Sequence, residues 1–242
     1  MSEPRFFIPP DARHGERVTF SPEQSRQISK VLRLRPGSVV YALDNAGWIY
    51  TVRLETVGRE RVVGRVVDRQ AAGGEPPLEV ILYVALLKGE KMDWVLQKGT
   101  EVGVTQFVPM LTRRAVVRRR EVKARWERIL QEAAEQSGRA FIPRLAPVHS
   151  WEEALEHAVR APLCLLAHPS DAVPLRRLWE STSPPDRVAL LVGPEGGFAE
   201  EEVEEARARG CRIVHLGPRI LRAETAAVIL PALLLHHWGD LG

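Results

Sequence analysis

Apolar residues in the first 70 positions recur in short runs with polar neighbours, a pattern typical of β-strands. These runs are rich in Val, Tyr and Thr and lie at 17–20, 39–43, 48–54 and 61–67. Residues 22–32 instead have helical spacing, with Ser21 placed to cap the helix and Pro22 in its first turn. The pattern predicts a compact, β-barrel-like module over residues 1–70.

Beyond a Gly- and Pro-containing linker at 71–77, apolar strand-like runs alternate with amphipathic helical stretches. The expected strands are 78–87, 106–111, 163–167, 188–192 and 211–216. The expected helices are 91–102, 121–137, 174–180, 200–209 and 225–238, the last largely apolar and so buried. This alternation predicts an α/β domain with a mainly parallel sheet over residues 78–242.

Three of these strands break at a dipeptide that ends in proline. The breaks are His168-Pro169, Gly193-Pro194 and Gly217-Pro218, and we call the surrounding loops the first corner (166–169), second corner (193–197) and third corner (216–226). If the three strands are parallel, the corners lie at one edge of one sheet. Open α/β sheets bind ligands at the carboxyl edge, so the corners predict one composite site.

The composition is that of a soluble globular protein, with 45% hydrophobic and 27% charged residues among 242. The longest apolar stretch, 226–235, is too short to span a bilayer, and the N-terminus lacks the apolar core of a signal peptide. We therefore expect a cytoplasmic protein without a membrane partner. The two cysteines, Cys164 and Cys211, are far apart in sequence and are expected to be plain buried thiols.

Charge is unevenly distributed along the chain. The formal net charge is +3 overall, but it is +4 over residues 1–74, +6 over 86–144 and −5 over 145–242. This distribution is compatible with a polyanion that contacts the first two-thirds of the chain, and equally with a solvated surface. The histidines have no convincing metal-ligand spacing, so no metal is expected.

The second and third corners carry the candidate chemistry. In the second, glycines let the backbone approach a ligand closely and proline stiffens the turn, which suits an adenosine or ribose as well as a plain tight turn. It matches neither the GxGxxG nor the P-loop pattern. In the third corner, Arg222 and Glu224 lie beside a buried helix, where a charged side chain normally has an ion-pair partner or a functional role.

GPEGGF at 193–198, followed by LGPRILRAETA at 216–226, resembles the SPOUT RNA methyltransferases. The resemblance is to the family that methylates N3 of a uridine in 16S ribosomal RNA of the small subunit (the RsmE family). It covers most of the chain, including VLRLRPG at 31–37, QKGTEVGV at 97–104 and EAAEQSGR at 132–139. The chain departs from the family at 112–115, where Thr-Arg-Arg-Ala replaces Glu-Arg-Ser, so either Arg113 or Arg114 matches the family's arginine.

The resemblance implies a PUA-like RNA-binding β-barrel at 1–70, a linker at 71–77, and a methyltransferase domain at 78–242 with a C-terminal deep trefoil knot. It also implies a homodimer. The implied cofactor is S-adenosylmethionine, held by the three corners. Its expected contacts are Leu166, Ala167, His168, Gly193, Pro194, Glu195, Gly196, Gly197, Leu216, Gly217, Ile220, Leu221, Arg222, Thr225 and Ala226.

For the implied reaction, Arg222 is the candidate for stabilising the developing uracil anion or for holding the adjoining phosphate. Either Glu224 or Glu195 takes the imide proton. The candidates for contact with the RNA are Arg5, Arg13, Arg17, Arg33, Arg113, Arg114 and Arg139. Two alternatives remain from the sequence: a SPOUT methyltransferase with another RNA target, and a non-catalytic RNA-binding factor in ribosome assembly.

Overall fold

The computed structural model describes residues 3–118, 121–170 and 172–242, and the chain divides into two compact units. Unit 1 comprises Met1–Glu75 and Ala134–Ile142, and unit 2 comprises Pro76–Ala133 and Pro143–Gly242. The first boundary falls inside the linker expected at 71–77. Residues 134–142, which the sequence assigns to the second domain, group with unit 1.

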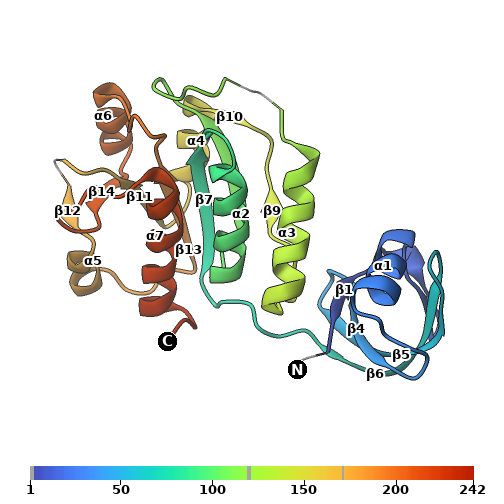
Figure 1. The fold of residues 1–242 in the computed structure, drawn as a ribbon. Coiled ribbons are helices and arrows are strands. Elements are labelled where there is room, and N and C mark those ends of the chain that lie inside the picture. The colour runs from blue at the N-terminus through green and yellow to red at the C-terminus, as the bar shows by residue number, and fades with distance from the viewer. Residues whose placement is uncertain (1–2, 119–120, 171) are drawn as a thin grey trace. The chain divides into compact units, whose positions relative to one another are not determined.

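Unit 1 contains a curled, mixed six-stranded sheet (Figure 1). In chain order its strands are β1 (Arg5–Phe7), β2 (Arg13–His14), β3 (Arg17–Thr19), β4 (Val39–Leu43), β5 (Trp48–Val57) and β6 (Val62–Ala71), with the turn η1 (Pro10–Ala12) between the first two. The spatial order is β1-β4-β5-β6-β3-β2, and β1 is parallel to β4 while the other pairs are antiparallel. The pairing of β5 with β6 shifts register twice, and such irregularities bend strands and favour the curl.

The helix predicted at 22–32 is present as α1 (Pro22–Arg26), continued by a π-helical turn, η2 (Gln27–Val31). Ser21 caps it as expected: its Oγ accepts from the Gln24 N–H, and the Gln24 side chain accepts from the Ser21 N–H. The Ser25 hydroxyl accepts a 2.9 Å hydrogen bond from the Val62 N–H of β6. Ile28 is fully buried in the core of unit 1, so the helix covers the curled sheet.

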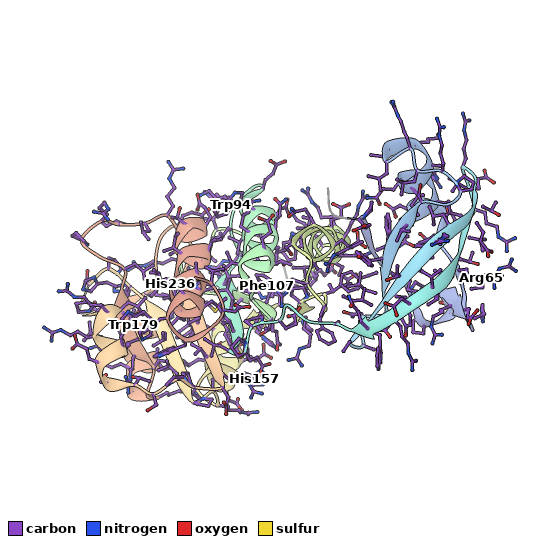
Figure 2. The ribbon with its side chains drawn as sticks, turned by 90° about the horizontal axis from the view of Figure 1, so that it is seen from below. Arg65, Trp94, Phe107, His157, Trp179 and His236 are labelled. Atoms are coloured by element: carbon purple, nitrogen blue, oxygen red, sulfur yellow. A yellow bond between two sulfur atoms is a disulfide. The ribbon has the colours of Figure 1, made fainter. Side chains whose placement is uncertain are left out.

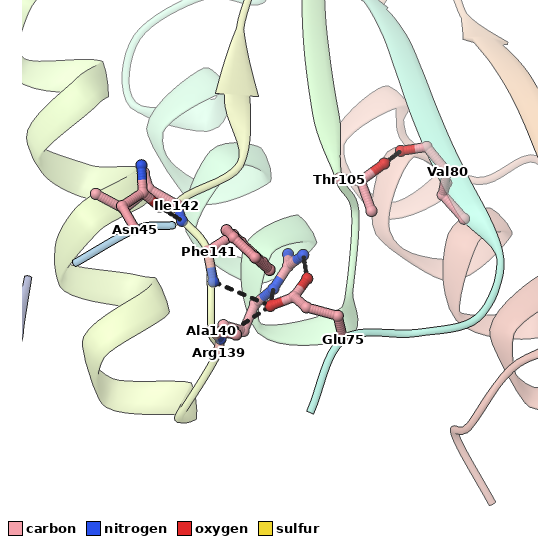
Figure 3. Close-up of polar contacts among 8 residues, drawn as sticks. All are labelled: Asn45, Glu75, Val80, Thr105, Arg139, Ala140, Phe141 and Ile142. Carbon is pink, nitrogen blue, oxygen red and sulfur yellow. Dashed lines mark hydrogen bonds and ion pairs between the residues drawn. The ribbon is translucent and has the colours of Figure 1, made fainter. Parts of the chain in front are cut away.

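Glu75 is one of the residues that join the 134–142 segment to the rest of unit 1 (Figure 3). One Glu75 oxygen accepts from the Ala140 N–H at 2.9 Å and the Phe141 N–H at 3.2 Å. The other lies 2.5 Å from the Arg139 guanidinium, which is only 4% exposed. Nearby, the Ile142 N–H donates to the Asn45 side chain. A buried charge paired in this way is a structural element of the unit.

Unit 2 contains a parallel sheet, which confirms the predicted architecture of this part. Its strands are β7 (Glu79–Ala85), β8 (Gln106–Leu111), β9 (Arg144–Leu145), β10 (His149–Ser150), β11 (Leu163–Ala167), β12 (Val173–Pro174), β13 (Arg187–Val192) and β14 (Arg212–His215). Their order is β10-β8-β7-β13-β11-β14-β12, with β9 beside β8. The central strands are almost entirely buried, as parallel strands covered on both faces must be.

Among the described residues, the helices that lie wholly or partly in this unit are α2 (Lys91–Val102), α3 (Ala124–Ser137), α4 (Trp151–Ala158), α5 (Arg176–Ser181), α6 (Glu200–Ala208) and α7 (Ala223–Trp238). α4 and α6 pack on one face of the sheet through a shared buried cluster that includes Trp151 and Val203. α7 packs against β7 and β13, and α2 lies beside α7 (Figure 1). No helix within the described ranges is both long enough and apolar enough to span a membrane.

The core side chain Phe107 of β8 is fully buried in unit 2 (Figure 2). It requires a glycine on α2, because a Cβ at Gly99 would lie 2.8 Å from its ring. This glycine allows α2 to approach β8 closely. The first residue of α2, Lys91, lies at the carboxyl end of β7.

The expectation of two plain buried thiols is wrong: Cys164 and Cys211 form a disulfide. Both are buried as predicted. β11 pairs in parallel with β14, with Leu165 opposite Arg212, so the residues just before them are also neighbours. The two cysteines are 47 residues apart in sequence, and periodicity alone does not reveal strand order.

The disulfide predicts that protein purified without reductant and then denatured contains no titratable thiol. Reduction should lower the free energy of unfolding by up to about 4 kcal/mol, the chain-entropy value for a loop of this size. Thiol titration and thermal unfolding with and without reductant measure both quantities. The Cys164→Ala/Cys211→Ala variant, whose melting temperature should not respond to reductant, is the control. Two thiols titrating in the unreduced protein would contradict the pairing.

Candidate active site

The carboxyl ends of five neighbouring strands form one edge of unit 2. β8, β7, β13, β11 and β14 are adjacent in that order and all parallel. The first, second and third corners follow β11, β13 and β14, so the prediction that all three meet at one edge is confirmed. The segments after β7 and β8 reach the same edge, because parallel strands all end on the same side.

Two adjoining cavities open among these strand ends. The larger, of about 680 Å³, is bounded by the first and second corners, part of the third, and the side chains of Lys91 and Arg114. The smaller, of about 80 Å³, lies between the first and third corners. Ala167, His168, Ile220 and Ala226 line both. The larger volume lies within the range of roughly 300–1,000 Å³ that is usual for sites of small organic ligands.

Two glycines allow the second corner to form a tight turn, one because its neighbours leave no room for a side chain and the other because of its backbone conformation. A Cβ at Gly193 would lie 3.0 Å from the ring of Phe198, so a side chain there would crowd the corner. Gly197 has φ +68, a conformation that L residues rarely adopt, and its N–H donates to the Pro194 carbonyl at 2.9 Å. The corner is therefore a tight turn whose backbone lines the cavity.

Glu195 of the second corner is held by the segment that follows β7. Its Oε1 accepts from the Lys88 N–H at 3.2 Å and from the Lys91 ammonium at 3.0 Å. Burial alone would raise the pKa of this carboxyl, but backbone hydrogen bonds and the Lys91 ammonium together lower it. Glu195 is thus an ionised anchor of the corner and a weak proton acceptor.

Glu224 lies in the first turn of α7, and no side chain among the described residues caps that helix. Its Oε2 is buried and accepts no hydrogen bond from the part of the chain that the structure describes, and it lies 3.5 Å from the Lys91 ammonium. Arg222 is exposed, precedes α7 and lines the larger cavity. Glu224 therefore has a carboxylate oxygen without a hydrogen-bond donor among the described residues, whereas Oε1 of Glu195 already accepts two hydrogen bonds.

Of the two arginines that follow β8, Arg114 is the one at the cavity. Its guanidinium donates to the Gly196 carbonyl at 3.3 Å. Arg113 instead forms an ion pair with Glu201 at 3.3 Å, and its N–H donates to Glu202. Arg114 can act on a ligand in the cavity, whereas Arg113 joins the loop to α6.

Most of the expected cofactor contacts line the two cavities. These are Ala167, His168, Gly193, Pro194, Glu195, Gly196, Gly197, Leu216, Gly217, Ile220, Leu221, Arg222 and Ala226. Leu166 is fully buried in the core, and Thr225 is not among the lining residues. The sequence analysis did not select Lys91 as a site residue, although the same edge rule applied to the 78–87 strand would have done so.

The arginines expected to contact RNA are placed differently from one another. In unit 1, Arg13, Arg17 and Arg33 are exposed. Arg5 donates to the Gly138 carbonyl at 2.8 Å. Arg139 must be corrected from an RNA contact to a structural residue, because it is buried and paired with Glu75 (Figure 3). Within the described residues, no group of three His, Cys, Asp or Glu side chains could hold a metal ion.

Comparison with known proteins identifies the relatives of this chain. A family model described as an RNA methyltransferase domain matches residues 74–235. The ribosomal RNA small subunit methyltransferase E of Bacillus subtilis is 34% identical over 223 residues, covering 87% of each protein. The protein of the same name from Synechocystis is 32% identical, covering 93% of this chain and 75% of the relative.

Solved structures agree over the whole chain. The ribosomal RNA small subunit methyltransferase E of Neisseria gonorrhoeae, bound to S-adenosyl methionine, superposes with a TM-score of 0.89 at 33% identity, with 100% of both chains covered. A putative methyltransferase from Legionella pneumophila, in complex with the same cofactor, gives a TM-score of 0.90 at 31% identity, again with 100% of both chains covered.

The anchoring of Glu195 predicts a pH-dependent loss of stability in Glu195→Gln. Because the pKa of Glu195 is lower in the folded state, its ionised form stabilises the fold above the unfolded pKa, and this contribution disappears as pH falls through the folded pKa. The difference in melting temperature between wild type and variant should therefore be largest near neutral pH and vanish as the pH falls below the lowered pKa of Glu195. Thermal unfolding at a series of pH values measures it. A difference in melting temperature that does not depend on pH would contradict the role of Glu195 as an ionised anchor.

Proposed function

The chain belongs to the ribosomal RNA small subunit methyltransferase E family, and we propose that it transfers the methyl group of S-adenosylmethionine to N3 of a uridine in 16S ribosomal RNA. The observation that carries the proposal is the common cavity. The two segments with the family's sequence pattern, 193–198 and 216–226, are far apart in sequence but line one cavity at the edge of a parallel sheet.

The residues around the cavity suit S-adenosylmethionine. The tight backbone of the second corner offers N–H and C=O groups to ribose hydroxyls, and Ile220 and Leu221 offer apolar surface to adenine. A Cβ at Gly197 would meet no atom of the chain within 4 Å, so this side of the turn is open to a ligand. When bound, the cofactor supplies an electrophilic methyl group on a sulfonium, so correct placement of the acceptor nitrogen accounts for much of the rate.

The chain's own residues must stabilise a uracil that loses its N3 proton. Arg222 and Arg114 present cationic side chains at the cavity, where they can stabilise negative charge on uracil oxygens or hold the adjoining phosphate. Glu224 is the candidate proton acceptor, since the Glu195 carboxylate already accepts hydrogen bonds and has a lowered pKa.

Unit 1 supplies further contact with the RNA as a PUA-like domain. Its curled sheet and its exposed Arg13, Arg17 and Arg33 support this role, because guanidinium groups bind phosphates through paired hydrogen bonds. The natural partner is the small ribosomal subunit or its RNA. The protein accordingly acts in the cytoplasm, in ribosome biogenesis.

The C-terminal part of unit 2 forms a deep trefoil knot in this proposal. Two features support it. β14 lies beyond β11 in the sheet, yet α7 returns to pack against α2, β7 and β13. The third corner makes this return across the strand ends, where it lines the same cavity as the second corner. Knots are very rare in proteins, so the path of this loop is a specific feature of the family.

The active form is a homodimer. Apolar side chains that a monomer would leave in water support it: Trp94 on α2 is 42% exposed (Figure 2), and Ile229 and Leu233 on α7 are 41% and 39% exposed. α2 and α7 are packed together, so these residues belong to one helical pair. A second copy of the chain would remove this apolar surface from water.

The direct test is methyl transfer from labelled S-adenosylmethionine to unmethylated small subunits and to their free RNA. We expect label in one uridine, identified as 3-methyluridine by mass spectrometry of the digested RNA. Label in another nucleotide, or in transfer RNA, would support a different target. Cofactor binding without transfer to either substrate would support the non-catalytic assembly factor instead.

Adjacent arginines provide the matched variants for this assay. Arg222→Ala and Arg114→Ala should each lower kcat by roughly 10²-fold, as expected when a group that stabilises developing charge is removed, while cofactor affinity stays near normal. Arg113→Ala should stay within about threefold, because Arg113 pairs with Glu201 at the surface. Loss of cofactor affinity in Arg222→Ala would make Arg222 a structural residue.

A further inference from the structure

Lys91 is a charged residue at the cavity to which the proposed chemistry gives no role. It is the first residue of α2, and its side chain is 34% exposed. Its ammonium lies 3.0 Å from Oε1 of Glu195 and 3.5 Å from Oε2 of Glu224. One lysine thus bridges two carboxylates.

The two carboxylates belong to different walls of the cavity. Glu195 lies in the second corner, after β13, and Glu224 lies in the first turn of α7, after β14. Two carboxylates directed at one point repel each other unless a cation lies between them. The Glu224 Oε2 is buried and accepts no hydrogen bond from any described residue, so the Lys91 ammonium is the positive charge that faces it.

Helix stability does not explain a lysine at this position. The N-terminus of a helix carries partial positive charge, which favours carboxylates and disfavours an ammonium. The hydrogen bond with Glu195 is instead the main cause of a raised pKa of Lys91, with Glu224 contributing. The Lys88 N–H donates to the same Glu195 oxygen, so the segment between β7 and α2 holds the second corner at two points.

We propose that Lys91 is a positioning residue that joins the second corner to the start of α7 and thereby fixes the width of the cofactor cavity. The identity of the ligand rests on the proposed function. Lys91 acts through Glu195 and Glu224, so its main effect is on cofactor affinity.

Calorimetry with S-adenosylmethionine tests this role in Lys91→Met. We expect the Kd to rise roughly tenfold or more, the scale of a lost charge-assisted hydrogen bond, with the loss appearing in the KM for the cofactor more than in kcat. Lys91→Arg keeps the charge and the donors and should recover most of the affinity. The matched control is Lys98→Met: Lys98 is on the same helix, 37% exposed, and pairs with Glu101 away from the cavity. It should change the Kd less than twofold.

A double-mutant cycle separates bridging from general loosening of the fold. In a Glu224→Gln background, Lys91→Met should raise the Kd for S-adenosylmethionine by a clearly smaller factor than it does in the wild type, since the bridge is already weakened. Three outcomes would each overturn the proposal: the same factor of change in Kd in both backgrounds, wild-type cofactor affinity in Lys91→Met, or a loss of cofactor affinity in Lys98→Met equal to that in Lys91→Met. If Lys91→Met does not fold, the cycle between Glu195→Gln and Glu224→Gln replaces it, and additive costs there would overturn the bridge.

Cofactor binding by the wild-type protein separates a failure of the proposed function from a failure of the role of Lys91. Wild-type protein that binds no S-adenosylmethionine contradicts the proposed function. Wild-type binding together with unchanged affinity in Lys91→Met contradicts only the role of Lys91.

Discussion

The parallel pairing of β13, β11 and β14 is the constraint on which the site depends. In a parallel sheet every strand ends on the same side, so the pairing of the strands brings together loops that are far apart in sequence. The first, second and third corners are brought together in this way. Such strands must be covered on both faces, and α4 and α6 cover one face while α7, with α2 beside it, packs against β7 and β13.

The same constraint concentrates charge at the edge. Arg114 follows β8, Lys91 follows β7, Glu195 follows β13, and Arg222 and Glu224 follow β14. Glu195 and Lys91 form an ion pair at the cavity wall. In the proposed function, Arg114 and Arg222 are then the cations that act on a substrate that becomes negatively charged.

The sequence was sufficient for the features that local patterns encode. Continuous apolar runs predicted β11 and β13, the Ser21 cap predicted the start of α1, and the proline breaks predicted the common edge. It was incomplete for short elements and for features that long-range pairing decides. α4 was missed although Ser150 and Glu153 form a capping box, and β1 and β2 are too short to show a period. The disulfide and the burial of Arg139 depend on which distant residues become neighbours.

The central claim is that one cavity, bounded by the three corners, holds S-adenosylmethionine. Glycine amide signals in a ¹⁵N-labelled protein test it directly, because glycines at 193, 196, 197 and 217 lie in the corners while those at 15, 37 and 58 lie in unit 1. Titration with the cofactor should shift the first group strongly and leave the second unchanged. Unshifted corner glycines, with shifts confined to other parts of the chain, would contradict the account.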